Sequence, residues 1–369
     1  MYITDIELKN FRNYEALSLH FNEKVNLILG DNAQGKTNLI EAIYLSSIGK
    51  SFRTSRDAEL IRFGEDSAKV TVSAVKDNID TVVEIMINAK GKSSSDKFIK
   101  KDRKNITRSS QLLNNIMIVV FSPEDLKIVK DEPEKRRRFI DRELCQISPQ
   151  YYDCYTNYRK ALLQRNALLK EDRVDREILD IWDEQLAKYG STMIMLRDMF
   201  IKEISGYSAA IHAGITDGKE TLKLKYLPNF EPKKDVDETY QKLYVALGEA
   251  YESDRRNRTT SVGPHRDDIA FYVNDVDMRS YGSQGQQRTC ALSLKLAELN
   301  IIREDTGEEA ILLLDDVMSE LDASRQEYLI DTMKENQLFI TTTDLDPAIL
   351  AKFSEISVFR VKEGKIDRE

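Results

Sequence analysis

The chain has 369 residues, and its 55 Lys and Arg against 63 Asp and Glu give a formal net charge of −8. With 41% hydrophobic and 32% charged residues, the composition is that of a folded globular protein and excludes extensive disorder or a fibrous repeat. The acidic balance argues against nucleic-acid binding, for which a basic domain is the usual sign, unless the basic residues are clustered.

Cysteine and histidine are rare, with three residues of each. The cysteines, Cys145, Cys154 and Cys290, form no C-x-x-C pair, which argues against a disulfide framework and against a zinc site. No apolar run approaches the roughly 20 residues that span a bilayer, and the first residues carry charges where a signal peptide needs an apolar segment. We therefore expect a cytoplasmic protein that does not enter a membrane.

The first hundred residues have the pattern of strands around one helix. Alternating apolar residues at 17–21, 70–74 and 82–87, and the apolar run 25–29, predict strands. Apolar residues at helical spacing predict a helix over 38–47.

The middle of the chain has a helical pattern. From about 153 to 206 turn residues are almost absent, which predicts two helices that pack antiparallel. The buried face of the second helix is expected to comprise Ile178, Trp182, Leu186, Tyr189, Met193, Leu196 and Phe200. One more helix should end near 251, and strand signals then persist from 259 to a C-terminal hairpin over 356–366.

This order predicts an α/β domain made from both ends of the chain, residues 1–122 and 256–369, with an inserted helical domain at 123–255.

The clearest motif is Gly30-Asp31-Asn32-Ala33-Gln34-Gly35-Lys36-Thr37, which fits the P-loop pattern G-x-x-x-x-G-K-S/T between a predicted strand and a predicted helix. Backbone N–H groups of such a loop and the helix N-terminus bind phosphates. We expect Lys36 to reach the β- and γ-phosphates and the Thr37 hydroxyl to hold Mg²⁺. The loop and the following Asn38 predict a site for ATP.

A second motif, Ile311-Leu312-Leu313-Leu314-Asp315-Asp316, has the pattern of a buried parallel strand that ends in two carboxylates. By itself it is common, but a P-loop far upstream makes it the expected partner. Asp315 would bind Mg²⁺ directly or through water, and Asp316 would orient or activate the attacking water.

A third motif, Ser283-Gln284-Gly285-Gln286, precedes a helix with Leu292, Leu296 and Leu299 on its buried face. It is similar to the S-x-G-Q signature of ABC-type ATPases, in which the Ser and a helix N-terminus meet the γ-phosphate bound by another subunit. Ser283, Gly285 and Gln286 are the expected contacts. Ser319 to Asp322, just after the acidic strand, resembles the D-loop of the same proteins.

The chain as a whole resembles the RecF family of bacterial recombinational repair proteins. The residues that carry the resemblance include Asn10 to Tyr14, a motif shared with the SMC group, and the blocks Lys50 to Thr54, Phe121 to Leu126, Trp182 to Leu186 and Gly263 to Asp268. The resemblance implies an ABC/SMC-like P-loop ATPase head with mixed sheets and an inserted helical arm. It also places Arg12 in the nucleotide site, and it implies a weak, DNA-stimulated ATPase that works at single-strand gaps with RecR and RecO.

Two departures from the wider ABC pattern concern catalysis. Asp316 stands where Glu is usual, and Phe339 to Asp344 offers hydroxyls where a His is common. Lys36, Asp315 and Asp316 are the expected catalytic residues, and we expect slow hydrolysis because an imperfect general base commonly lowers rates by about two to four orders of magnitude.

Basic residues cluster in three places despite the acidic total, one of which is the run 135–138. Residues 90–108 contain eight basic residues and two acids, and a further group follows the P-loop helix. Such clusters bind DNA phosphates without reading sequence, although a solvated surface is the alternative for each. The expected DNA contacts are Lys50, Arg53, Arg56, Lys97, Lys100, Lys101, Arg103 and Lys104. For His265 and Arg136 to Arg138, structural and functional roles both stay open.

The sequence thus predicts an ATP-dependent DNA-binding protein of recombinational repair. ATP would join two copies head to tail around duplex DNA, and slow hydrolysis would release them. The alternatives are a nuclease-coupled ABC ATPase, for which too few residues follow Asp315, and an SMC-type structural ATPase, for which the inserted helices are too short. A scaffold that never hydrolyses ATP also stays open.

Overall fold

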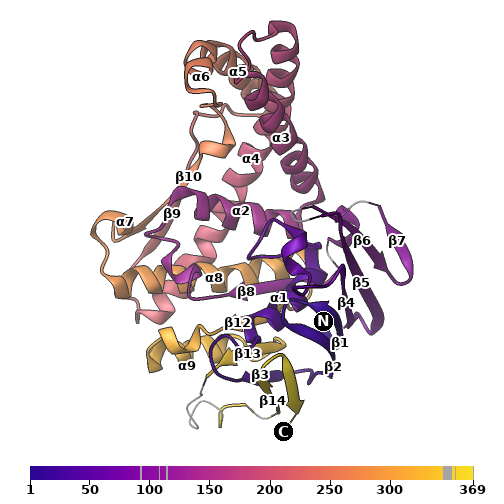
Figure 1. Cartoon of the computed structure of the whole chain (residues 1–369). Coiled ribbons are helices and arrows are strands. Elements are labelled where there is room, and N and C mark those ends of the chain that lie inside the picture. The colour runs from indigo at the N-terminus through magenta and orange to yellow at the C-terminus, as the bar shows by residue number, and fades with distance from the viewer. Residues whose placement is uncertain (92–93, 108, 114, 344–350, 354, 369) are drawn as a thin grey trace. The chain divides into compact units, whose positions relative to one another are not determined.

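The computed structural model describes residues 1–91, 94–107, 109–113, 115–343, 351–353 and 355–368 (Figure 1). Three residues of the sequence motifs, Lys92, Arg108 and Asp344, lie outside these ranges. Within the described part, no helix is both long enough and apolar enough to cross a membrane.

The first sheet is antiparallel and has six strands. Their order is β2 (Tyr14–His20), β1 (Tyr2–Phe11), β4 (Ser67–Lys76), β5 (Ile79–Ala89), β6 (Ser95–Lys101) and β7 (Lys104–Ile106). Buried and more exposed residues alternate along β4 and β5, so one face of this sheet packs on the core and the other faces solvent.

The second sheet is mixed. Its order is β15 (Lys365–Arg368), β14 (Ile356–Lys362), β3 (Val25–Leu29), β13 (Leu338–Thr342), β12 (Ile311–Asp315) and β8 (Ile118–Phe121). All neighbours pair in parallel except β14 and β15, which form the predicted hairpin. Every residue of β12 and β13 is buried, which explains the apolar runs 311–314 and 338–340.

Helix α1 (Lys36–Ile48) packs against strands of both sheets. Eleven of its 13 residues are buried, including Leu39, Ile40 and Ile43, and they join the two sheets in one hydrophobic core. The apolar residues of this helix lie on more than one face, and such a helix needs an enclosed position. Helix α9 (Ala323–Thr332) follows β12 in the chain.

The remaining elements are mainly helical. They are α2 (Pro133–Ile147), α3 (Pro149–Leu168), α4 (Arg176–Ile215), α5 (Val236–Glu249), α6 (Tyr251–Asn257), α7 (Met278–Tyr281), α8 (Gln284–Thr306) and a sheet of β11 (Val276–Asp277), β10 (Asp268–Val273) and β9 (Leu222–Leu227). Helices α3 and α4 pack side by side, and α4 also contacts α5 and β9.

The chain divides into two compact units, Met1–Asp125 with Glu298–Glu369, and Leu126–Ala297. The second border lies within α8, so residues 256–297 group with the helical unit, whereas the sequence analysis assigned them to the ATPase head. The division into a head of residues 1–122 and 256–369 and an insertion of residues 123–255 therefore stays a prediction.

The predicted buried face of α4 is wrong at its beginning. Ile178 is 44% exposed, whereas its neighbour Leu179 is buried. The buried positions of α4 also include Asp183 and Arg197. Because charged residues occupy two of the buried positions, apolar spacing alone does not locate the buried face. It therefore began this face at Ile178, one residue before Leu179.

These buried charges belong to ion pairs inside the helical unit. Arg165, fully buried, binds Asp183 and, at 2.7 Å, Asp254. Arg197 binds Asp141 at 2.6 Å and Asp267 at 3.1 Å. Pairing of this kind removes the large cost of leaving a charge alone in the interior.

The Gly263 to Asp268 block has a structural role in the same unit. His265 contacts the Tyr158 hydroxyl through Nδ1 at 2.7 Å and the Thr260 carbonyl through Nε2 at 2.9 Å. Arg136 forms two bonds to Asp268, at 2.5 and 3.0 Å. Arg137 donates to the Asp267 carbonyl, and Arg138 pairs with Glu134 at the surface. These contacts support the structural interpretation of His265, Arg136 and Arg137.

Candidate nucleotide-binding site

The second sheet brings the two central motifs together. Strand β13 lies between β3, which leads into the P-loop, and β12, which ends at Asp315. Since the three strands are parallel, their carboxyl ends meet at one edge of the sheet, where ligands of such sheets bind. The sequence motifs are 278 residues apart at their contact, yet the Thr37 hydroxyl donates to Asp315 Oδ1 at 2.9 Å.

Two glycines of the P-loop are required by its geometry. Gly35 has φ = +124°, which is accessible mainly to glycine. A Cβ atom on Gly30 would lie 2.5 Å from the Val361 carbonyl oxygen, so no side chain fits there. Among the described residues, no side chain caps the α1 N-terminus after Gly35, and its first N–H groups are therefore available to an anion.

Two turns from distant parts of the chain hold the P-loop at Gln34. The Gln34 carbonyl accepts hydrogen bonds from Asn13 Nδ2 at 2.9 Å and from the Gly364 N–H at 3.2 Å. Its side-chain oxygen accepts from the Glu363 N–H at 2.7 Å. The β1–β2 turn and the C-terminal hairpin thus fix the loop, a role that the sequence analysis missed because none of these partners is near Gln34 in the chain.

Lys36 is buried and lies within the P-loop. Its ammonium group donates to the carbonyl oxygens of Gly30 at 2.5 Å and Asp31 at 3.1 Å. The lysine charge is therefore held at the mouth of the loop, where phosphate binding requires it.

Asp315 sits at the centre of a small hydroxyl network. In addition to Thr37, the Thr341 hydroxyl donates to Asp315 Oδ1 at 2.8 Å. Burial raises the pKa of Asp315 above its ordinary value, while the hydrogen bonds from Thr341 and Thr37 oppose this shift. A buried carboxylate of this kind gains from a nearby cation. Thr341, at the end of β13, was not among the predicted site residues.

Asp316 adopts an unusual backbone conformation, with φ = +57°. Its N–H donates to the Thr341 carbonyl at 3.1 Å and hydroxyl at 3.0 Å, which fixes the residue directly after Asp315. Asp316 is half-buried and follows the carboxyl end of β12, at the same edge of the sheet as the P-loop.

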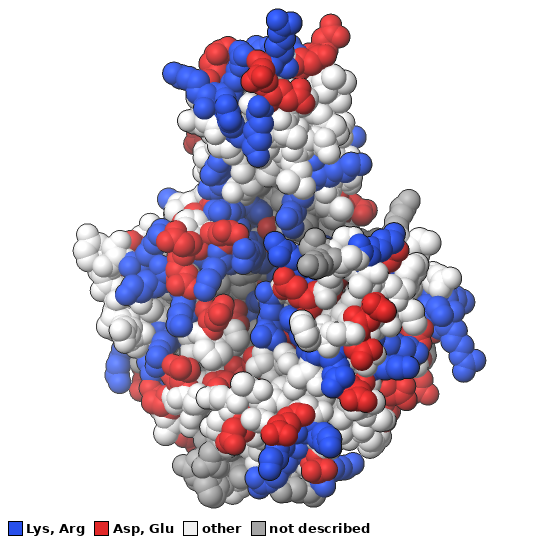
Figure 2. Space-filling model, in the orientation of Figure 1, with Lys and Arg blue, Asp and Glu red and all other residues white. Residues whose placement is uncertain are grey.

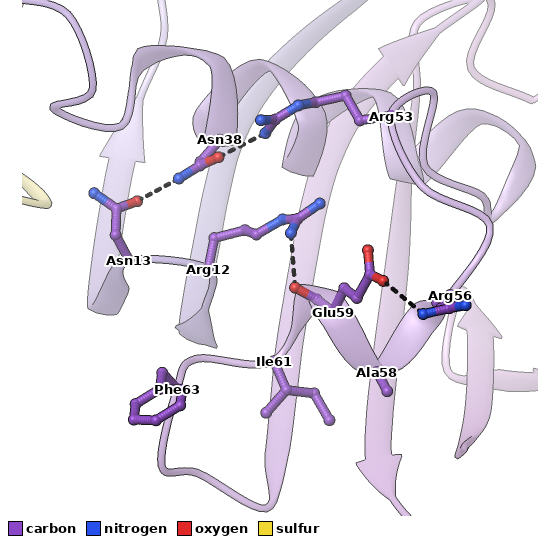
Figure 3. A pocket seen from close by; sticks show the side chains of 9 residues that line it. All are labelled: Arg12, Asn13, Asn38, Arg53, Arg56, Ala58, Glu59, Ile61 and Phe63. Carbon is purple, nitrogen blue, oxygen red and sulfur yellow. Dashed lines mark hydrogen bonds and ion pairs between the residues drawn. The ribbon is translucent and has the colours of Figure 1, made fainter. Parts of the chain in front are cut away.

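A cavity of about 550 Å³ lies beside the start of α1 (Figure 3). Its wall is a mixture of cationic, amide and apolar side chains. These belong to Arg12, Asn13, Asn38, Arg53, Arg56, Ala58, Glu59, Ile61 and Phe63. Asn13 accepts from Asn38, and Asn38 accepts from Arg53, so the residues between the P-loop helix and the cavity form one hydrogen-bonded row.

A buried carboxylate that the sequence analysis missed organises these cations. Glu41 on α1 is completely buried, and Arg12 binds it with two hydrogen bonds of 2.8 Å. Ser51 and Arg53 donate to the same carboxylate, at 2.5 and 3.2 Å. One glutamate within the apolar stretch 39–45 was the available signal, since a buried carboxylate requires cationic partners.

The signature motif lies in the helical unit and begins α8. The Ser283 hydroxyl accepts from the Gln286 N–H at 3.2 Å, and Gln286 Oε1 accepts from the Ser283 N–H at 3.1 Å. These reciprocal bonds form a capping box. Gln287 donates to the carbonyls of Met278 and Gly282, which fixes the preceding turn.

The predicted DNA contacts differ in their surroundings. Arg53 and Arg56 line the cavity, and Lys97 pairs with Asp57 and donates to the Gly49 carbonyl. Lys100 is 3.6 Å from Glu84, while Lys50 is partly buried after α1.

The three remaining residues, Lys101, Arg103 and Lys104, surround the β6–β7 turn, and we refer to them as the tip cluster. No ion pair of the tip cluster occurs among the described residues, and Lys101 and Lys104 lie opposite each other. In Figure 2, Lys and Arg side chains project from the edge where Figure 1 places β6 and β7.

Comparison with known proteins agrees with this geometry. Residues 2–366 match the family model described as the RecF/RecN/SMC N terminal domain. The chain is 45% identical over 369 residues to the DNA replication and repair protein RecF of Alkaliphilus oremlandii, with both chains covered completely. It is 44% identical to the RecF protein of Clostridium perfringens strain SM101, with 99% of each chain covered.

Solved structures give the same result. A structure of the recombination mediator protein RecF with ATP in the RecFOR pathway superimposes with a TM-score of 0.89 at 36% identity, covering 100% of this chain and 97% of the other. An Smc head bound to a domain of ScpA shares the fold, with a TM-score of 0.56 at 18% identity over 100% of this chain and 97% of the other. The predicted ATPase head fold with mixed sheets and helices is confirmed, and the chain belongs to the RecF family.

Proposed function

We propose that this protein binds ATP at the P-loop and uses it to act on DNA in recombinational repair. The observation that carries the proposal is the contact between Thr37 and Asp315, since it joins the phosphate-binding loop to the acidic strand end at one sheet edge. The relatives that are named as replication and repair proteins, and the solved RecF–ATP structure, support the same assignment.

The residues present fit a magnesium ion bound with the nucleotide. The Thr37 hydroxyl and the Asp315 carboxylate are oxygen donors, which Mg²⁺ prefers. No group of three or more His, Cys, Asp and Glu side chains in the described ranges could hold a metal alone. Phosphate oxygens and water would therefore complete its coordination, and the ion would neutralise charge on the transferred phosphoryl group.

The cavity beside α1 fits the base and ribose of the nucleotide. Phe63 is fully exposed at its rim and offers a ring face to a base, while Arg12 and Asn38 offer donors to polar groups. This assigns Phe63 to the site in addition to the predicted Arg12 and Asn38. The predicted Arg53 would act here through Asn38 and Glu41, whether or not it also contacts DNA.

ATP would also join two copies of the chain. Ser283 is exposed at the N-terminus of α8, where first-turn N–H groups favour an anion. The Ser283 loop of a second copy would close on the γ-phosphate, and Lys36 would contact the same phosphate from the first copy. Asp316 would orient water for hydrolysis; a slow rate follows from the short side chain that holds this carboxylate.

DNA would bind through the basic residues of the head. The tip cluster supports this proposal because Lys101 and Lys104 repel each other across the hairpin, and a polyanion would relieve that cost. Duplex DNA at single-strand gaps is the expected substrate, with RecR and RecO as partners in the cytoplasm and DNA as a stimulator of the ATPase. The RecFOR pathway named for the solved relative supports these partners.

Light scattering with size-exclusion chromatography tests the composite site. Wild type should form dimers with ATP, while Lys36→Ala and Ser283→Arg should stay monomeric, because one loses phosphate binding and the other blocks the loop. Asp315→Asn tests the acidic strand end, and we expect it to bind ATP and hydrolyse it more slowly. Equal dimerisation of Ser283→Arg and wild type would refute the composite site.

A further inference from the structure

Hydrogen bonds connect the signature loop to a buried histidine in the same helical unit. Gln286 Nε2 donates to Glu220 Oε1 at 2.8 Å, and Glu220 Oε2 lies 3.1 Å from His212 Nε2. Glu220 belongs to the turn between α4 and β9, and His212 lies in the last turn of α4. The His212 side chain is completely buried and Glu220 is 22% exposed.

Both ring nitrogens of His212 have hydrogen-bond partners in the helical unit. His212 Nδ1 lies 3.2 Å from the Ser293 hydroxyl oxygen, and the same hydroxyl is 2.8 Å from the Thr289 carbonyl. His212 Nε2 faces a carboxylate oxygen, and an ionised carboxylate only accepts. In the tautomer protonated at Nε2, His212 therefore donates to Glu220 and orients its carboxylate.

We propose that Glu220 and His212 are positioning residues for the signature loop. They fix the side-chain amide of Gln286, whose oxygen holds the Ser283 N–H. The backbone N–H of Gln286 in turn donates to the hydroxyl oxygen of Ser283. The hydroxyl proton of Ser283 can then be donated to a phosphate bound by the second copy. This inference rests on the proposed dimer and adds the residues that prepare its loop.

The advantage of this arrangement is preorganisation. Glutamine side chains near the surface lose rotamer freedom when they become ordered, and an interface that must order them on binding loses affinity. With both polar atoms of its amide engaged, Gln286 is ordered before the second copy arrives. The hydrogen bond to Glu220 involves a charged acceptor, which makes it stronger than a neutral one.

Glu220→Ala should weaken ATP-dependent dimerisation by about 10- to 100-fold, because each dimer uses two such loops and each must then order its Gln286 side chain on association. ATP binding to the monomer should not change, since the P-loop residues are not altered. Glu220→Gln should retain dimerisation, because a glutamine still accepts from Gln286 and can donate to a neutral His212. Asp217→Ala is the matched control, a carboxylate of the same turn that is 81% exposed and pairs with Lys219.

A reciprocal pair separates positioning from a direct role of Gln286. Gln286→Glu keeps a capping box but places its carboxylate against Glu220, and dimerisation should fall. Adding Glu220→Gln restores a donor opposite the new carboxylate, and dimerisation should recover at least tenfold over Gln286→Glu alone. If the double variant is as weak as the single one, the new charge or a direct contact of Gln286 is responsible and the positioning role is refuted.

Dimer association constants from sedimentation, measured beside ATP affinity and thermal unfolding, give the readout. Recovery in the double variant, with unfolding unchanged, would support the proposal. Dimerisation of Glu220→Ala equal to that of Asp217→Ala would overturn the positioning role while leaving the composite site intact. A wild type that binds ATP and stays monomeric would overturn the proposed dimer, and with it this inference.

Discussion

Replacing Glu41 by glutamine should destabilise the ATPase unit through the cations of the cavity. The carboxylate is completely buried and accepts two bonds from Arg12, one from Ser51 and one from Arg53. Glutamine has nearly the same shape, but its amide nitrogen donates. One carboxylate oxygen is therefore replaced by a donor that faces donors.

The magnitude follows from these contacts. A hydrogen bond to a charged group contributes about 1.5–3 kcal/mol, and removing one member of a fully buried ion pair costs about 3–5 kcal/mol. Arg12 and Arg53 are 19% and 41% exposed, so water can solvate them in part after the change. We expect a loss near the lower end, about 3 kcal/mol, which in a unit of this size lowers the melting temperature by about 6–12 °C.

Differential scanning calorimetry measures this loss, with Glu59→Gln as the control. Glu59 belongs to the same cavity, but its side chain is 47% exposed and lies 3.7 Å from Arg56. Its substitution should change the transition little, because exposed ion pairs contribute little. If Glu41→Gln melts within 1–2 °C of Glu59→Gln, roughly what 0.5 kcal/mol produces, the buried Arg12 fork gives no net stability and the reasoning is wrong.

Three further predictions concern stability and DNA. Burial lowers the pKa of His265 to about 4, so between about pH 6.5 and pH 4 the unfolded chain binds a proton that the folded chain does not. The free energy of unfolding should therefore fall by about 3 kcal/mol as pH drops from about 6.5 to about 4. In His265→Gln, the free energy of unfolding obtained from urea denaturation should depend less on pH over this range. Arg165→Met leaves two buried carboxylates without their cation and should lower the free energy of unfolding by about 3–5 kcal/mol, measured by thermal unfolding. The control Arg138→Met changes an exposed pair and should lower it little. Equal losses in the two variants would contradict the stabilising role of the buried network. Changing the tip cluster to glutamines should weaken DNA binding at every sequence, and the slope of the logarithm of the binding constant against the logarithm of the salt concentration should become smaller by about 2–3. The control Lys219→Gln should leave this slope unchanged. An unchanged slope in the tip-cluster variant would place the DNA surface elsewhere.

The local elements of the nucleotide site were predictable because their signals are short-range. The P-loop from Gly30 to Thr37 needs its glycines for backbone reasons, and the strand that ends at Asp315 is apolar because both faces of a parallel sheet are covered. The predicted strand 25–29 and helix 38–47 correspond to β3 and to most of α1. Motif order along the chain then identified the class of ATPase.

The sequence also contained signals that only became interpretable in three dimensions. A charged residue within an apolar pattern, such as Glu41 or Asp183, indicates burial only if a partner is near, and the partners Arg12 and Arg165 are 29 and 18 residues away. Apolar spacing treats such residues as exposed. For the same reason it placed Ile178 on the buried face of α4, where Leu179 lies instead.

By itself, then, the sequence determined where the P-loop and the acidic strand end lie, because spacing and backbone requirements are encoded within a few residues. The tertiary structure decided which residues hold them in place. Thr341 reaches Asp315 only because β13 lies between β3 and β12, and Gln34 meets Glu363 only because the C-terminal hairpin pairs with β3. Strand order and buried pairing depend on contacts across hundreds of residues, which no local pattern records. The net charge of −8 is a sum over the whole chain, and the tip cluster, for which the described residues contain no ion pair, shows that basic side chains can gather locally in a protein that is acidic in total.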